Sequence, residues 1–291
     1  MTSPTFPDGA VVVGVDGTGK AERALVWAGN EAARRKAAVH IVYAFPWLTS
    51  VRSDVVMPAA DVVEAGERIT TAAMNQVRAA HPEVTVTTEV LLEEPDVALV
   101  NASERASFVV MGARGLGRIA SRLRGSVSQK VASHAHSPVV VVREEAKKID
   151  GPVVVGVDLE DNATNVLEFA FATAASRGFG VLVVHADRGD NVRPEFVDEG
   201  VQRFLSKRSE ATARAVEELV SGVRERYPEV PVEIKRVAGH PVDALVSESE
   251  QACMVVVGSR GRRGLAGLGS VSRGVLHEAP VVAVVREPAA T

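Results

Sequence analysis

A stretch rich in glycine and serine between residues 107 and 130 has the residue types of an anion-binding loop. Its fixed points are Gly112, Gly115, Gly125 and Ser126, in the pattern G-x2-G-x9-G-S. Glycines have no Cβ atom, so main-chain N–H groups can approach an anion closely, and Ser126 would begin a helix whose positive end favours phosphate. The pattern therefore predicts a phosphate-binding loop.

The charge of this stretch supports the same interpretation, since no Asp or Glu occurs between Glu104 and Glu144. The spacing is not that of a Walker P-loop, because no Lys precedes Ser126. It also differs from the G-x-G-x-x-G fingerprint, which belongs to the first strand-to-helix turn of a sheet. We treat the surrounding arginines as a supporting positive field rather than as ligands: Arg118, Arg122 and Arg124.

Short apolar runs alternate with helical patterns along the chain, which predicts right-handed βαβ units and a parallel sheet. The segment Val153–Asp158 repeats Val11–Asp16 after 142 residues, and residues 255–261 repeat residues 109–115 after 146 residues. This is a tandem duplication. We therefore predict an α/β fold with two doubly wound domains, at residues 1–146 and 152–291.

Composition sets limits on the class of protein. The chain has 291 residues, 46% of them hydrophobic, and a formal net charge of −4, which argues against nucleic acid or an anionic membrane as a partner. A single cysteine, Cys253, excludes an intramolecular disulfide and fits a reducing compartment. No signal-peptide pattern and no apolar run of ~18 residues occurs in the sequence. We expect a soluble, cytoplasmic protein.

The strand before Gly112, the glycine loop, the Gly-Ser-Val-Ser sequence at 125–128 and the run Ser137-Pro-Val-Val-Val-Val-Arg143 together resemble the universal stress protein family, in its ATP-binding subclass. The resemblance implies a five-stranded parallel sheet of order 3-2-1-4-5 in each repeat, flanked by helices. It also implies ATP as the ligand, with any Mg²⁺ carried by its phosphates, and a regulatory role in stress response or growth control. A homodimer formed through the last strands, at 139–142 and 281–285, and an unknown protein partner are further expectations.

In doubly wound sheets a ligand binds outside the carboxyl ends of the strands. Asp16 ends the first strand, where it could bind ribose or adenine or could simply cap the next helix. Ala44 ends the second strand, where it could leave room for a base or could simply pack. By the resemblance, the first-half site comprises Gly14, Val15, Asp16, Ala44, Met111, Gly112, Arg114, Gly115, Gly125, Ser126, Val127 and Ser128.

The second half departs from the pattern in its loop. Seven residues separate Gly261 from Gly269, whereas nine separate Gly115 from Gly125. A second nucleotide site is therefore possible but has a shortened phosphate loop. Its corresponding residues are Asp158, Ala186, Gly258, Arg260, Gly261, Gly269, Ser270, Val271 and Ser272.

No residues have the spacing of a nucleophile with its base, and none have metal-ligand spacing, so we predict neither catalytic residues nor a protein-held metal. The leading hypothesis is an ATP-binding regulator, with weak ATP hydrolysis at most. Two alternatives stay open. A slow ATPase on the same fold would need a positioned base or an in-line Lys at the γ-phosphate. A partner-binding module would have only its first site occupied.

Overall fold

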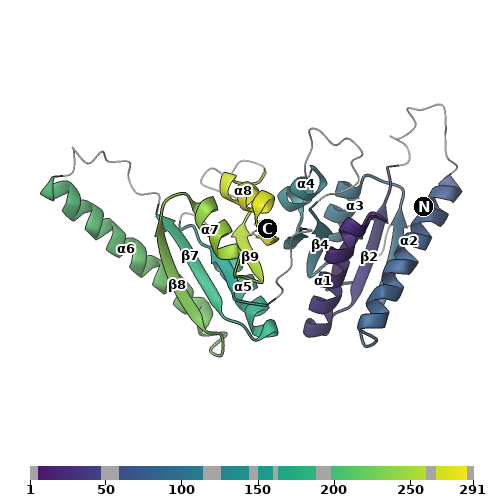
Figure 1. Cartoon of the computed structure of the whole chain (residues 1–291), viewed down its shortest axis with the longest axis horizontal. Helices are drawn as coiled ribbons and strands as arrows, with labels where there is room; N and C mark the ends of the chain where they lie inside the picture. The colour runs from purple at the N-terminus through teal and green to yellow at the C-terminus, as the bar shows by residue number, and fades with distance from the viewer. Residues whose placement is uncertain are drawn as a thin grey trace. The chain divides into compact units, whose positions relative to one another are not determined.

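The computed structural model describes residues 6–46, 59–113, 126–143, 150–159, 163–187, 198–259 and 267–286. The chain divides into two compact units (Figure 1). The first unit consists of residues 1–147, 266–268 and 280–291, and the second of residues 148–265 and 269–279.

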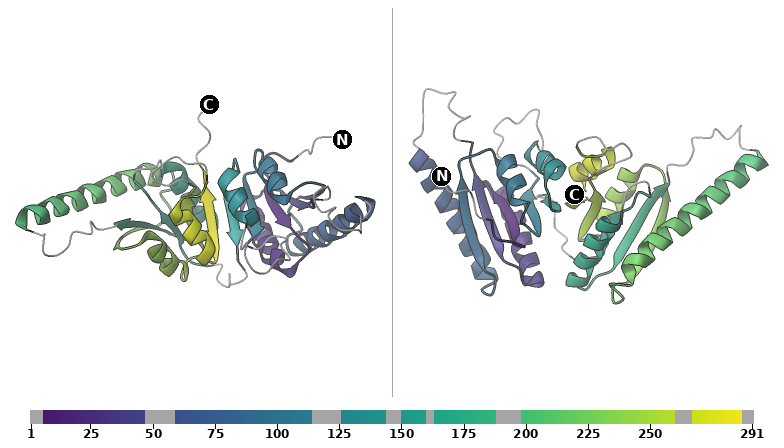
Figure 2. Two further views of the ribbon diagram at one scale, coloured as in Figure 1. Left: turned by 90° about the horizontal axis from the view of Figure 1, so that it is seen from above. Right: turned by 180° about the vertical axis from the view of Figure 1, so that it is seen from behind.

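The first repeat consists of β1 (Val11–Val15), α1 (Gly19–Arg35), β2 (Val39–Ala44), α2 (Ala59–Ala80), β3 (Val86–Leu91), α3 (Pro95–Ala102), β4 (Phe108–Gly112), α4 (Ser126–His134) and β5 (Val139–Val142). Its five strands are parallel and lie in the order β3-β2-β1-β4-β5. Helices α1 and α2 pack together against β1 to β4, and α3 and α4 pack together against the strands from the other side (Figure 2).

The second repeat has the same sequence of elements: β6 (Val153–Gly156), α5 (Thr164–Arg177), β7 (Val181–Asp187), α6 (Glu199–Arg224), β8 (Val232–Ala238), α7 (Pro241–Ser249), β9 (Met254–Gly258), α8 (Ser270–Glu278) and β10 (Val281–Val285). Its strands follow the order β8-β7-β6-β9-β10. The predicted α/β class and the strand order 3-2-1-4-5 are therefore confirmed. The proposed boundary near residue 150 stays a prediction, and residues 144–149 lie outside the described residues.

The central strands are apolar along their whole length because helices cover both faces of the sheet. Val11, Val12 and Val13 of β1 are fully buried. In the edge strand β3 only Val86 is buried, and Thr87 and Thr88 are both exposed. The contrast explains why the valine runs mark the centre of the sheet in the sequence.

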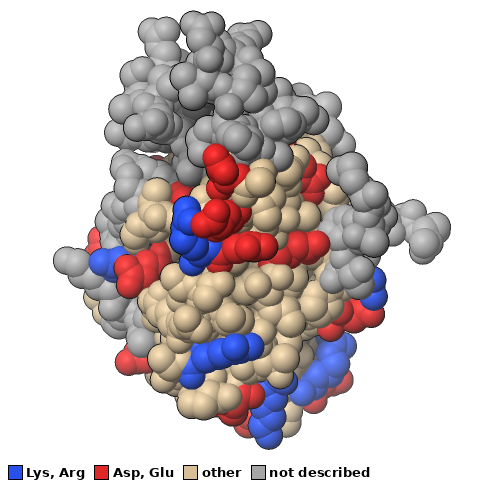
Figure 3. All heavy atoms as spheres, turned by 90° about the vertical axis from the view of Figure 1, so that its right-hand side faces the viewer, with Lys and Arg blue, Asp and Glu red and all other residues tan. Residues whose placement is uncertain are grey.

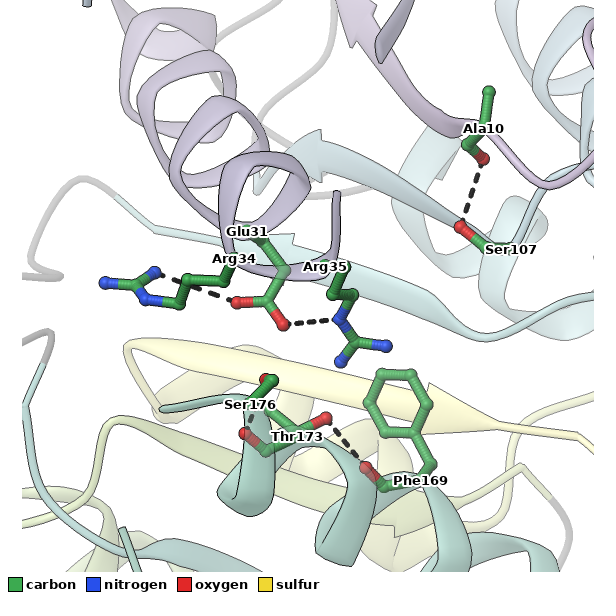
Figure 4. A network of polar contacts seen from close by, with 8 residues as sticks. All are labelled: Ala10, Glu31, Arg34, Arg35, Ser107, Phe169, Thr173 and Ser176. Carbon is green, nitrogen blue, oxygen red and sulfur yellow. Dashed lines mark hydrogen bonds and ion pairs between the residues drawn. The ribbon is translucent and has the colours of Figure 1, made fainter. Parts of the chain in front are cut away.

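Helix α1 carries a buried carboxylate near its carboxyl end (Figure 4). The Glu31 side chain is fully buried and accepts a hydrogen bond from Arg35 Nε at 2.6 Å, while Arg34 Nη1 lies 3.8 Å from its other oxygen. A buried charge is costly unless it is paired, and these two arginines provide the pairing. The Arg35 guanidinium also lies 5.0 Å from the centre of the Phe108 ring, which ties α1 to β4.

The side of the first unit that carries α2 shows charges of both signs, with acidic side chains gathered across its middle (Figure 3). Helix α2 itself contains an exposed ion pair between Arg68 and Glu64, at 2.6 Å. Exposed pairs of this kind stabilise a helix by only about 0.3–0.5 kcal/mol.

Among the described residues, none of the helices combines the length and the apolar character needed to cross a bilayer.

Strand β10 belongs with the first unit, where it runs antiparallel to β5. Val281 lies opposite Val142 and Val284 opposite Val139. Because β4 pairs with the other side of β5, both edges of β5 are occupied. The contact between last strands that we expected across two copies thus forms within one chain, and the homodimer stays a prediction.

Candidate functional site

A pocket opens at the carboxyl ends of β1, β2 and β4 in the first unit. The space free of protein atoms there, with the open solvent at its mouth, is about 470 Å³. This is the edge of a doubly wound sheet at which ligands bind. Seven residues of the predicted first-half site line it: Gly14, Val15, Asp16, Ala44, Met111, Gly112 and Val127.

Three helices begin at this pocket. Ala21 lies in the first turn of α1, Pro95 is the first residue of α3, and Val127 is the second residue of α4, and all three line the pocket. The first turn of a helix has free N–H groups and a partial positive charge. The pocket therefore joins apolar strand ends to a rim that favours an anion.

Helix α3 approaches the sheet closely at Gly14. A Cβ atom on Gly14 would lie 3.0 Å from Leu99 Cδ1 of α3, which is tighter than an ordinary contact. Val42 and Ala44 both line the pocket, because alternate residues of a strand share one face. Leu99 of α3 completes this part of the wall. On the side formed by β1 and β2, the pocket is thus lined by small and apolar side chains.

Asp16 lines the pocket, where its contact with ribose or adenine stays a prediction. It does not cap α1, because Thr18 is the N-cap residue; its carboxylate instead stabilises the turn before the helix. Its Oδ1 accepts hydrogen bonds from Thr18 N at 2.9 Å and from Thr18 Oγ1 at 2.7 Å. Within the described part of the chain, no donor binds Oδ2. Burial, together with the negative charge of Asp16, raises the pKa of Tyr43 above its usual value, so the phenol beside this carboxylate stays neutral. Asp16 therefore keeps one oxygen available at the pocket.

Part of the predicted phosphate loop lies outside the described residues. This applies to Arg114, Gly115, Gly125, Arg260 and Gly261, and to the surrounding Arg118, Arg122 and Arg124. Ser126 begins α4, and Ser128 in the same turn is buried, with 3% of its surface exposed. The loop between Gly112 and Ser126 stays a prediction.

The second unit repeats the same framework. A Cβ atom on Gly156 would lie 2.9 Å from Leu245 Cδ1, as Gly14 lies against Leu99 in the first unit. Ser272 Oγ donates a hydrogen bond of 2.5 Å to the carbonyl oxygen of Gly258, which ties the first turn of α8 to the end of β9.

The remaining residues predicted for the second half lie at the corresponding strand and helix ends. Asp158 is exposed just after β6, and Ala186 lies near the end of β7. Gly269 comes immediately before α8, whose first two residues are Ser270 and Val271. The role of this second set in nucleotide binding stays a prediction.

Sequence reasoning missed four residues that line the first pocket: Ala21, Val42, Pro95 and Leu99. Val42 could have been found, since it lies two residues before Ala44 on the same strand face. Pro95 and Leu99 belong to a helix that enters from the far edge of the sheet. Nothing in the local periodicity indicates that this helix packs on β1.

His40 lies deeper on the pocket-facing side of β2, with 4% of its surface exposed. Its Nδ1 lies 2.8 Å from Thr87 Oγ1, and its Nε2 lies 3.3 Å from Glu89 Oε2. Burial lowers the pKa of His40, and the hydrogen bond to Glu89 partly opposes this. Nearby, Glu93 Oε1 is buried and has no hydrogen-bond partner among the described residues, and burial and Glu89 raise the pKa of Glu93.

His40 should make the free energy of unfolding decrease as the pH falls below ~6.5, the pKa of an unfolded histidine. Above that pH, His40 is neutral in both states. Below it the unfolded chain binds a proton that the folded chain does not, so stability is lost, by at most ~1.4 kcal/mol per pH unit, until the lower folded pKa is reached. Urea unfolding at pH 7.5 and 5.5 measures the loss. It should be smaller in His40→Gln, and equal losses would contradict the assignment.

Similarity to known proteins identifies the family of this chain. The model of the universal stress protein family matches residues 9–143 and 151–286. A universal stress protein of Mycobacterium tuberculosis strain H37Rv is 34% identical over 310 residues, which cover 96% of this chain and 95% of that protein.

Solved structures show the same fold. The crystal structure of a universal stress protein from Archaeoglobus fulgidus DSM 4304 is 22% identical, with a TM-score of 0.72 over 98% of both chains. A universal stress protein from Archaeoglobus fulgidus solved in complex with dAMP is 28% identical, with a TM-score of 0.33, and covers 48% of this chain and 98% of that chain. Since the family model matches both halves and a relative at 34% identity spans nearly the whole length, this chain belongs to the universal stress protein family, with the family's domain present twice in tandem.

Proposed function

We propose that this chain binds an adenine nucleotide, ATP above all, in the pocket of the first unit and acts as a nucleotide-dependent regulator in stress response or growth control. One observation carries the proposal: the pocket joins a small apolar wall to the amino ends of three helices. Such a site suits a ligand with a flat apolar end and an anionic end.

The strand side of the pocket suits the base and the ribose. Gly14 and Ala44 have little or no side chain to obstruct a purine. Asp16 Oδ2 would accept a hydrogen bond from a ribose hydroxyl or from the adenine amino group.

The phosphates would lie at the helix side of the pocket. The first turn of α4 follows the predicted loop, whose glycines would offer main-chain N–H groups. Mg²⁺, if present, would arrive with the phosphates and neutralise part of their charge. The positive charge of Arg114 and its neighbours would support the same end of the nucleotide.

The regulatory part of the proposal rests on family membership. A nucleotide can change the state of the protein only as far as it binds one conformation more tightly than another. We propose that occupancy of the first pocket biases the conformation that a protein partner binds. The partner would then respond to nucleotide concentration without any chemical step.

The melting temperature in the presence of nucleotides tests this proposal. ATP at a hundred times its Kd should stabilise the chain by about 2.7 kcal/mol, which raises the melting temperature by several degrees. ADP and AMP rank the contribution of the phosphates, and GTP tests recognition of the base. An unchanged melting temperature with every adenine nucleotide at millimolar concentration would rule the proposal out.

A further inference from the structure

Helix α4 is anchored at the end opposite the pocket by a residue from the last strand. Arg286, which follows β10, donates a hydrogen bond from Nη1 to the carbonyl oxygen of Ser133 at 2.7 Å. The same nitrogen lies 3.4 Å from the carbonyl oxygen of Ala135. Carbonyl groups at a helix end lack partners within the helix, and a cation there complements the negative end of the helix dipole.

The seating of β10 brings Arg286 to this position. β10 pairs along β5, with Val284 opposite Val139, and Arg143 N donates a hydrogen bond of 2.9 Å to the carbonyl oxygen of Pro280. Arg286 thus comes from the second repeat in sequence but acts on a helix of the first. The first repeat depends on the last strand for this contact.

Helix α4 connects Arg286 to the pocket. Its nine residues span about 13 Å. Val127 lines the pocket at one end, and Val131 and Ala132 are buried in the middle. Because the middle of the helix is packed, a shift at its carboxyl end is transmitted to the first turn rather than absorbed by bending.

We propose that Arg286 is a positioning residue for the nucleotide pocket, so that seating of the last strand and nucleotide binding reinforce each other. This inference rests on the function proposed above. The coupling must be reciprocal: a seated strand raises nucleotide affinity, and bound nucleotide holds the strand in place. Couplings carried through packed elements correspond to changes in affinity of about two- to thirtyfold, and a single hydrogen-bonded contact should lie in the lower half of that range.

Arg286→Met in the full-length chain is the principal test, because methionine keeps an apolar stem and removes the charge and the donors. The Kd for ATP should rise about three- to tenfold. Hydrogen exchange at the amides of Val131 and Ala135 should become faster without nucleotide. Arg286→Lys should restore both properties to within about twofold, since an ammonium group can donate to the Ser133 carbonyl.

Arg105→Met is the matched control. It also removes one arginine from the first unit, where Arg105 bonds both oxygens of Asp8 before β1. Because this pair is exposed, the variant should lower the melting temperature little and leave the Kd for ATP unchanged. A merely structural role for Arg286 would leave the Kd of Arg286→Met unchanged as well.

The outcomes separate the two proposals. Unchanged exchange in α4 overturns the anchoring by Arg286, even if the chain binds ATP. Faster exchange with an unchanged Kd overturns the coupling to the pocket and leaves the proposed function standing. If the unsubstituted chain binds no nucleotide, the proposed function fails and the coupling fails with it.

Discussion

Ala44→Phe should weaken ATP binding by at least about 30-fold, because the added ring occupies the space proposed for the base. Ala44 ends β2, has 5% of its surface exposed and lines the pocket. Because its neighbours in β2 are buried, the phenyl ring should extend into the pocket. Isothermal titration with ATP measures the loss. Ala44→Ser changes the volume little and should bind ATP within about twofold of the native chain.

Ala186→Phe is the corresponding change in the second unit, 142 residues further along the chain. If the first pocket holds the tightly bound nucleotide, this variant should keep the native affinity. Native binding by Ala44→Phe together with loss of binding by Ala186→Phe would place the site in the second unit instead. Native binding by both variants would show that neither strand end holds the base.

Gly151→Ala should destabilise the second unit by about 3 kcal/mol or more, through two effects at one residue. Gly151 has a φ of +126°, which L residues rarely adopt, and a Cβ atom there would lie 2.4 Å from the carbonyl oxygen of Gln251. That oxygen belongs to the main chain and cannot rotate away as a side chain would. Calorimetry should show the melting temperature of the second unit fall by about 6 °C or more.

Gly239→Ala separates the backbone strain from the collision. Gly239 has nearly the same φ, +129°, but no atom of the described residues lies within 4 Å of the position of its Cβ. This variant should lower the free energy of unfolding only by the backbone strain, ~1–2 kcal/mol. An equal loss of stability in the two variants would show that the main chain near Gln251 moves away from the added Cβ atom without an energetic cost.

The repeated valine runs were enough to predict the sheet. Val11–Val15 and Val153–Gly156 are apolar throughout because they lie at the centre of parallel sheets, where the covering helices exclude water from both faces. Asp16 and Ala44 could be placed at the same edge of the sheet, because the carboxyl ends of parallel strands lie at one edge. Local sequence and one rule of topology therefore account for the position of the pocket.

Contacts between segments distant in sequence could not be predicted. Leu99 meets Gly14 because α3 crosses back over β1, and its periodicity as a short apolar helix does not say which strand it covers. Likewise, the apolar run Val281–Val285 indicates an edge strand that needs a partner but does not identify that partner. Its antiparallel pairing with β5, and with it the contact between Arg286 and α4, becomes evident only in the folded chain.

Equilibrium dialysis against labelled ATP, with the bound nucleotide counted per chain at the lowest concentration that saturates the native chain, tests the central claim most directly. The account predicts one tightly bound ATP per native chain, retained in Ala186→Phe and lost in Ala44→Phe. Two bound per native chain, falling to one in Ala44→Phe, would add a site in the second unit and keep the first. No ATP bound by the native chain at millimolar concentration, or an unchanged count in Ala44→Phe, would contradict a nucleotide site in the first unit.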